Sequence, residues 1–201
     1  MHTSGKELND KQELKKLLNT KVDFYNQPSF IKDDPISIPH LFTKQEDIEI
    51  AGFFAAIFSW GNRTTIINKA KELMQLMDMQ PHAFCLNHDL KGLKRLAGFK
   101  HRTFNADDLY YFIEFFQQHY SKYNSLETAF FPNKGMTAEE GLNHFKNTFF
   151  ETPTLRIDSL GEHRAERDVQ ELAAHTFIEV KRFVVGAAGE RSQRVDFRLR
   201  G

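Results

Sequence analysis

The stretch TKQEDIEIAGFFAAIFSWG, residues 43–61, decides the fold. Its middle is apolar on nearly every side of a helix, which is typical of a helix at the centre of a protein. Thr43 followed by Glu46 matches a capping box, and Gly61 is suited to a helix stop. The stretch therefore predicts a central buried helix around which the other segments pack.

The segments on either side also carry helical spacing of apolar residues, and none alternates with a period of two. Three prolines predict an extended connector over residues 27–42. The expected fold is all-α, a multi-helix orthogonal bundle. Beyond the central helix, the helices are expected at about residues 10–26, 64–80, 90–96, 105–120, 126–131 and 137–149.

The bulk composition is that of an ordinary globular protein. The 201 residues are 40% hydrophobic and 27% charged, with a formal net charge of zero. The longest uncharged apolar run, 50–60, is far shorter than the ~20 residues that span a bilayer. The N-terminus lacks the apolar core of a signal peptide, and Cys85 is the single cysteine. These features predict a cytoplasmic protein without a membrane span.

The composition changes near residue 151. Before it Lys outnumbers Arg 15 to 3, with 11 Asn; from residue 152 on there are 8 Arg, 1 Lys and no Asn. We therefore expect a helical domain at 1–151 and an atypical tail at 152–201, with one helix at 165–185. A change of reading frame near Glu151 would produce such a switch, so the C-terminal part is expected to be truncated or altered.

Two cationic segments are candidate binding sites. In Trp60-Gly61-Asn62-Arg63, the buried helix stops and Arg63 opens the next turn, where a guanidinium can hold an anion. The alternative is an ordinary helix corner, with Arg63 paired to an acidic residue.

The second segment is the densest positive cluster of the first 151 residues. Basic groups interleaved with aromatic rings suit phosphate contact and base stacking. The alternative is a solvated loop whose phenylalanines anchor it to the core. The basic residues of the cluster are Lys94, Arg95, Lys100, His101 and Arg102.

Other chemistry has little support in the sequence. His82, Cys85 and His88 are of the right types for zinc, but no second pair follows at ligand spacing, so no metal is expected. The phosphate loop, the dinucleotide fingerprint and the serine-nucleophile elbow are all missing, so no cofactor is expected and the chain cannot be assigned to an enzyme class.

Four motifs occur in order along the chain: DPISIPHLF (34–42), DIEIAGFFAA (47–56), WGNR (60–63) and FKHRTFNADDL (99–109). With them, residues 10–150 resemble a bacterial family of conserved hypothetical proteins of unknown function. That family is distantly similar to the helix-hairpin-helix DNA glycosylase superfamily. The resemblance implies an all-α, DNA-glycosylase-like fold and action on DNA, with both cationic segments at motif positions.

The resemblance also implies a C-terminal Leu-Asp-x-His segment with a catalytic aspartate, and this chain lacks it. The sequence thus predicts a DNA-binding, DNA-repair-like protein without catalysis. A helical scaffold or protein-interaction domain is the alternative. Altered C-terminal helices would leave part of the Phe-rich face of 105–150 exposed, which predicts oligomers.

Overall fold

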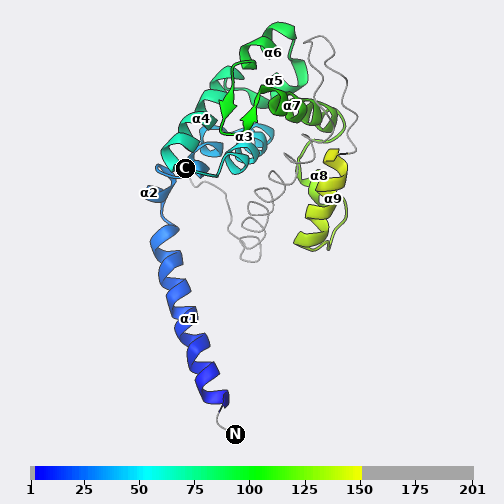
Figure 1. Cartoon of the computed structure of the whole chain (residues 1–201). Coiled ribbons are helices and arrows are strands. Elements are labelled where there is room, and N and C mark those ends of the chain that lie inside the picture. Colours follow the sequence, from blue (N-terminus) through cyan, green and yellow to red (C-terminus); the bar gives the residue numbers. More distant parts are fainter. Residues whose placement is uncertain (1–2, 151–201) are drawn as a thin grey trace.

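The computed structural model describes residues 3–150, with side chains from residue 9 onward. Its helices lie around a phenylalanine-rich core, and the all-α prediction is confirmed (Figure 1). A two-stranded hairpin is the one addition among the described residues. The elements, in chain order, are α1 (Thr3–Tyr25), α2 (Pro28–Ile31), η1 (Pro35–Ser37), η2 (Pro39–Leu41), α3 (Gln45–Ile57), α4 (Arg63–Leu76), α5 (Pro81–Asn87), α6 (Leu90–Leu96), β1 (Lys100–His101), β2 (Phe104–Asn105), α7 (Ala106–Tyr120), α8 (Glu127–Phe130) and α9 (Ala138–Phe150).

The central helix is α3, as the sequence predicts. Every residue from Ile50 to Phe58 is buried. Its rings meet those of α7 and α9: Phe53 contacts Phe116 at 5.3 Å and Phe145 at 5.7 Å between ring centroids. Because aromatic side chains bury large apolar areas, this three-helix contact forms the core of the domain.

Two predictions for the segment before α3 are wrong. The N-cap of α3 is Lys44 rather than Thr43, and no side chain caps the helix. The connector is not extended either, because α2, η1 and η2 are short helical turns with proline at the start of each. Proline fits the first turn of a helix, where its missing N–H would have no partner.

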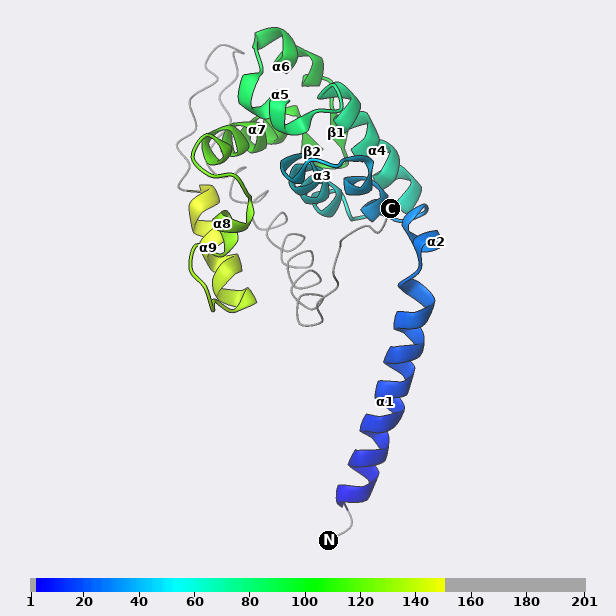
Figure 2. The same cartoon turned by 180° about the vertical axis from the view of Figure 1, so that it is seen from behind.

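The prediction that part of the Phe-rich face of residues 105–150 is exposed is also wrong for the phenylalanines of α7 and α9 that face the core. In α7 and α9, Phe112, Phe115, Phe116, Phe145 and Phe149 are all at most 3% exposed. Half of the exposed large apolar side chains among the described residues lie on α1, which stands clear of the helical body in both views (Figures 1 and 2). The helix expected at 165–185 lies outside the described residues.

Candidate nucleic-acid-binding face

The structure brings the two cationic motif segments together at the C-terminal end of α3. His101, in the hairpin, makes a 3.1 Å hydrogen bond through Nε2 to the carbonyl oxygen of Phe58. The Phe58 ring also contacts the rings of Phe99 and Phe104, at centroid distances of 5.6 and 5.2 Å. The hairpin is therefore fixed to the end of α3, immediately before the Trp60 turn.

Arg102 occupies the tip of the hairpin. Its backbone has a φ of +56°, a left-handed conformation that residues other than glycine, asparagine and aspartate rarely adopt. Its guanidinium lies 4.8 Å from the centre of the Trp60 ring, in a cation–π contact. Within the described part of the chain, no carboxylate lies within ion-pair distance of this exposed side chain. The fold thus holds a planar cation on an indole, and no described residue pairs with its charge.

Gly61 makes this contact possible. It has a φ of +119°, and a Cβ placed there would lie 2.5–2.9 Å from atoms of the Arg102 guanidinium. A side chain at this position would therefore be strained and would also push the guanidinium away from the indole.

Gly61→Ala is expected to cost about 2 kcal/mol of unfolding free energy, because a side chain at this positive φ strains the backbone, whereas the exposed Arg102 guanidinium can move aside at little cost. Chemical denaturation measures the loss. Gly98→Ala is the matched control, since a Cβ there meets nothing within 4 Å and Gly98 has no positive φ. It should be neutral or slightly stabilising, and equal losses in the two variants would contradict this account of Gly61.

Arg63 lies across the same turn. Asn62 caps α4 by accepting the N–H of Thr65 at 3.3 Å, which places Arg63 at the first helical position. The Arg63 guanidinium lies 4.0 Å from Asp34 and 5.9 Å from the centre of the Phe30 ring. Its side chain stays 59% exposed, so this long ion pair leaves it accessible.

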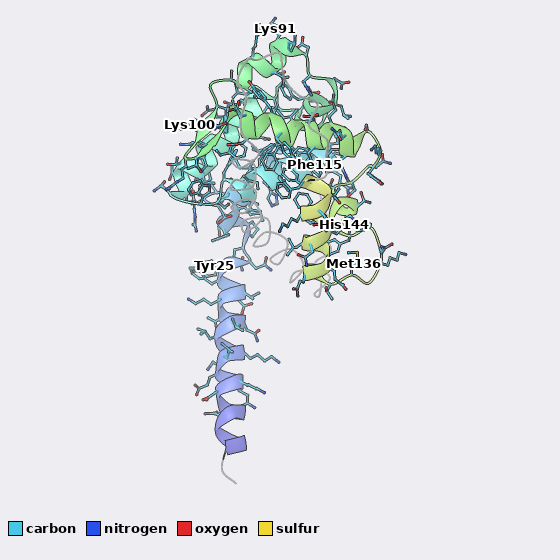
Figure 3. The ribbon with its side chains drawn as sticks, turned by 45° about the vertical axis from the view of Figure 1, so that its right-hand side comes forward. Tyr25, Lys91, Lys100, Phe115, Met136 and His144 are labelled. Carbon is cyan, nitrogen blue, oxygen red and sulfur yellow. The ribbon has the colours of Figure 1, made fainter. Side chains whose placement is uncertain are left out.

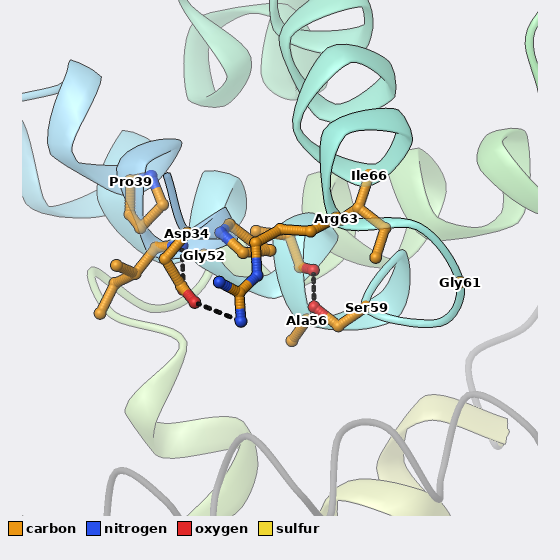
Figure 4. A pocket seen from close by; sticks show the side chains of 11 residues that line it. Asp34, Pro39, Gly52, Ala56, Ser59, Gly61, Arg63 and Ile66 are labelled. Atoms are coloured by element: carbon orange, nitrogen blue, oxygen red, sulfur yellow. Dashed lines mark hydrogen bonds and ion pairs between the residues drawn. The ribbon is translucent and has the colours of Figure 1, made fainter. Parts of the chain in front are cut away.

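A shallow pocket of about 440 Å³ lies beneath Arg63 (Figure 4). Small residues of α3 form its floor, and Ser59 donates a 2.6 Å hydrogen bond to the carbonyl oxygen of Ala55 there. Gly61 lines this pocket and also touches Arg102, so the pocket and the hairpin tip are neighbours. The lining residues are Asp34, Pro35, Ile36, Pro39, Gly52, Ala55, Ala56, Ser59, Gly61, Arg63 and Ile66.

The basic cluster that is continuous in the sequence is divided in space. Lys94 and Arg95 belong to α6, at one end of the body, whereas Lys100 and Arg102 belong to the hairpin beside α4 (Figures 1 and 3). Arg95 makes two hydrogen bonds of 2.7 and 2.6 Å to the carboxylate of Asp78. That guanidinium is therefore engaged, while Lys94 and Lys100 are exposed.

His101 is inside the fold rather than on its surface, with 3% exposure. Burial lowers the pKa of its imidazole, and the nearby charges of Arg102 and Lys69 lower the pKa further. The bond to the Phe58 carbonyl needs a ring N–H donor at Nε2. In this conformation, His101 fixes the hairpin and Lys100 and Arg102 carry the exposed charge.

Stability should fall as pH drops below about 6.5, because the unfolded chain then binds protons that the native His101 does not. A folded-state pKa below the unfolded one means that the stabilisation is complete above pH ~6.5 and is lost as pH falls through the folded pKa. Burial also lowers the pKa of His82 and His119, which add to the effect. Urea midpoints at neutral and mildly acidic pH measure it.

His101→Gln should reduce this pH dependence, while His40→Gln, at an exposed position in η2, should leave it unchanged. An identical pH profile in the wild-type chain and the His101 variant would contradict the assignment.

The histidine–cysteine spacing does not form a joint site in the described residues. Cys85 is fully buried, and burial raises the pKa of its thiol. His82 Nδ1 lies 2.9 Å from Lys44 Nζ, and His88 Nδ1 lies 3.0 Å from the Cys85 carbonyl oxygen. No group of three potential ligands gathers in this part of the chain.

One polar network was not predicted from the sequence. Glu49, in α3, accepts hydrogen bonds from Tyr120 Oη at 2.8 Å, Ser125 Oγ at 2.7 Å and the Leu126 N–H at 2.7 Å. Burial and the Glu49 charge raise the pKa of Tyr120. The partners lie more than 70 residues apart in the chain, so no local sequence signal connects them. The network joins α3 to the end of α7 and to the segment that precedes α8, so we assign it a structural role.

Fold and site together define an all-α protein with a cationic hairpin held against the end of its central helix. The chain belongs to the family described as protein of unknown function (DUF2400), whose family model matches residues 34–179. That match includes all four motifs and continues past the change of composition at 151. If the reading frame changed near residue 151, the family match would be expected to end there.

Other comparisons add nothing to this assignment. No curated protein and no solved structure matches the chain. Among the described residues, no helix has both the length and the apolar character needed to cross a bilayer.

Proposed function

We propose that this domain binds nucleic acid, with DNA as the ligand, through the hairpin and the Trp60 turn. The observation that carries the proposal is the position of Arg102, an exposed guanidinium stacked on an indole at a strained hairpin tip. Strained backbone of this kind clusters at functional sites. Arginine suits phosphate because its planar fork donates two parallel hydrogen bonds to one anion.

Lys100 and Arg63 extend the face to either side of Arg102. Lys100 pairs with Asn105 in the hairpin and is exposed, so its ammonium can follow a phosphate backbone. Arg63 is on the other side of Gly61, where it can exchange its long contact with Asp34 for a phosphate. Lys94 would contact phosphate at the edge of this face, and Arg95 could do so only after its hydrogen bonds to Asp78 break. His101 positions the hairpin and does not contact the ligand.

The proposed activity is binding of a DNA-repair type, without catalysis. This follows from the resemblance to DNA glycosylases, which extrude a base into a pocket beside a catalytic group. The segment expected to carry the aspartate is missing from the sequence. A cytoplasmic location is consistent with a DNA ligand and with the single buried cysteine.

The direct test is a titration of labelled duplex and single-stranded DNA with the full chain, at low and at physiological salt. Binding is expected at low salt and should weaken steeply as salt rises, because phosphate contacts release counterions. Failure of a folded, monodisperse sample to bind either DNA at low salt would overturn the proposal.

The second candidate is a helical scaffold with no nucleic-acid role, and the exposed apolar side chains of α1 are the observation that favours it. The two candidates differ in the titration above, since a scaffold shows no salt-dependent DNA binding.

A further inference from the structure

The phenylalanines that flank the basic cluster in the sequence are not available for base stacking. Phe99 and Phe104 are each 2% exposed. Their rings contact the Phe58 ring at 5.6 and 5.2 Å between centroids, and so they anchor the hairpin to the end of α3. A base needs an open ring face on which to stack, and neither ring offers one.

Trp60 is an aromatic residue that does lie on the proposed DNA-binding face. Its side chain is half-buried beside the hairpin. The Trp60 ring lies 6.1 Å from the His101 ring at an angle of 84°, and His101 is itself held by the Phe58 carbonyl oxygen. The Arg102 guanidinium lies over the indole, 4.8 Å from its centre. A buried residue therefore positions this ring, and an exposed side chain covers it.

The guanidinium that covers the indole can leave it at little cost. Arg102 is exposed at the hairpin tip, and no carboxylate of the described residues lies within ion-pair distance of it. Beneath the guanidinium is Gly61, which has no side chain to hold it in place. A cation–π contact at an exposed site is weak, whereas a base on an aromatic ring and a guanidinium on a phosphate are each stronger. Exchanging the first contact for the other two is therefore favourable.

We propose that a base of single-stranded DNA stacks on the Trp60 ring, while Arg102 moves from the ring to a neighbouring phosphate. This inference rests on the proposed function and adds the class of DNA, a strand with unpaired bases. Inside a duplex, both faces of each base are covered by its neighbours, so no base there can reach the indole. Phosphate contacts alone would favour the duplex, whose charge density is higher. Tighter binding of the single strand therefore reports the stacking.

Trp60 is the single tryptophan of the chain, so its fluorescence reports on this ring alone. Titration of the full chain with a single-stranded oligonucleotide should quench the emission, because a stacked base quenches an indole. The control is a strand of the same length whose sugars carry no bases, which keeps every phosphate and offers nothing to stack. It should bind at least about fivefold more weakly and should not quench the emission.

Substitution of Trp60 separates stacking from phosphate contact. Trp60→Leu should weaken single-strand binding by at least about fivefold and duplex binding by less than about twofold. The slope of log affinity against log salt should stay the same, because no charge is lost. Trp60→Phe keeps a ring and should recover most of the single-strand affinity. Tyr123→Leu removes a 50% exposed ring from another part of the surface and should change neither affinity.

The outcomes separate this inference from the function on which it rests. DNA binding without quenching, or equal single-strand affinity for Trp60→Leu and the wild-type chain, would overturn the inference and leave the proposed function intact. If Trp60→Leu weakens both DNAs equally and flattens the salt slope, Trp60 only supports the hairpin and the inference is wrong. Failure of a folded sample to bind either DNA would overturn the proposed function and the inference together.

Discussion

Phe112→Ala is expected to remove about 3–5 kcal/mol of unfolding free energy, the usual cost of deleting a buried phenylalanine. Phe112 is fully buried in α7, and its ring meets rings from four other positions. These are Phe53, Phe54, Phe104 and Phe149, at centroid distances of 5.6, 5.9, 5.7 and 4.9 Å. The deletion therefore affects the contacts of α7 with α3, β2 and α9 at once.

The loss is large relative to a total stability of roughly 5–15 kcal/mol for a domain of this kind. Urea denaturation followed by circular dichroism measures it. The matched control is Phe24→Ala in α1, where the side chain is 70% exposed and a change within about 0.5 kcal/mol is expected. A loss below about 1 kcal/mol in Phe112→Ala would mean that α7 is not packed as described.

The second large effect concerns DNA affinity. Lys100→Ala/Arg102→Ala should weaken binding at low salt by at least about tenfold, because hydrogen bonds to charged groups contribute about 1.5–3 kcal/mol each. Fluorescence anisotropy with labelled DNA measures the change. Lys122→Ala/Lys134→Ala removes the same charge from exposed sites near α8 and should change affinity little.

Arg102→Lys separates the role of charge from that of stacking. Lysine keeps the positive charge but loses the planar guanidinium that lies on Trp60. An affinity between those of the wild type and the double variant is expected. If Lys122→Ala/Lys134→Ala weakens binding as much as Lys100→Ala/Arg102→Ala, the contact is a general charge effect and the face is assigned wrongly.

The sequence predicts helices well where their ends are controlled locally. Asn105 caps α7 with a capping box that Asp108 completes, as its sequence position suggests. α6 spans the predicted residues 90–96. The capping box predicted at Thr43 does not form, because the N-cap of α3 is Lys44, one residue later. Acidic residues of α3 accept hydrogen bonds from other elements instead. Asp47, for example, accepts the His82 N–H at 2.9 Å and so holds the start of α5.

The sequence alone could nominate the residues of the candidate site, but it could not predict which of them lie in contact. Trp60 and Arg102 each stand in a motif, yet their contact depends on a hairpin whose strands have two residues each. Strands that short show no alternation in a sequence. The pairing of Arg95 with Asp78 was equally hidden, since the two lie 17 positions apart and Asp78 adopts a positive φ of 57°.

The central claim is that two motif segments build one phosphate-binding face around Arg102. The most direct measurement is the salt dependence of DNA affinity for the wild-type chain and for Lys100→Ala/Arg102→Ala. Each lost phosphate contact should reduce the slope of log affinity against log salt by about 0.9 on duplex DNA, so the double variant should have a slope smaller by roughly 2. Parallel slopes for the two proteins would contradict the claim.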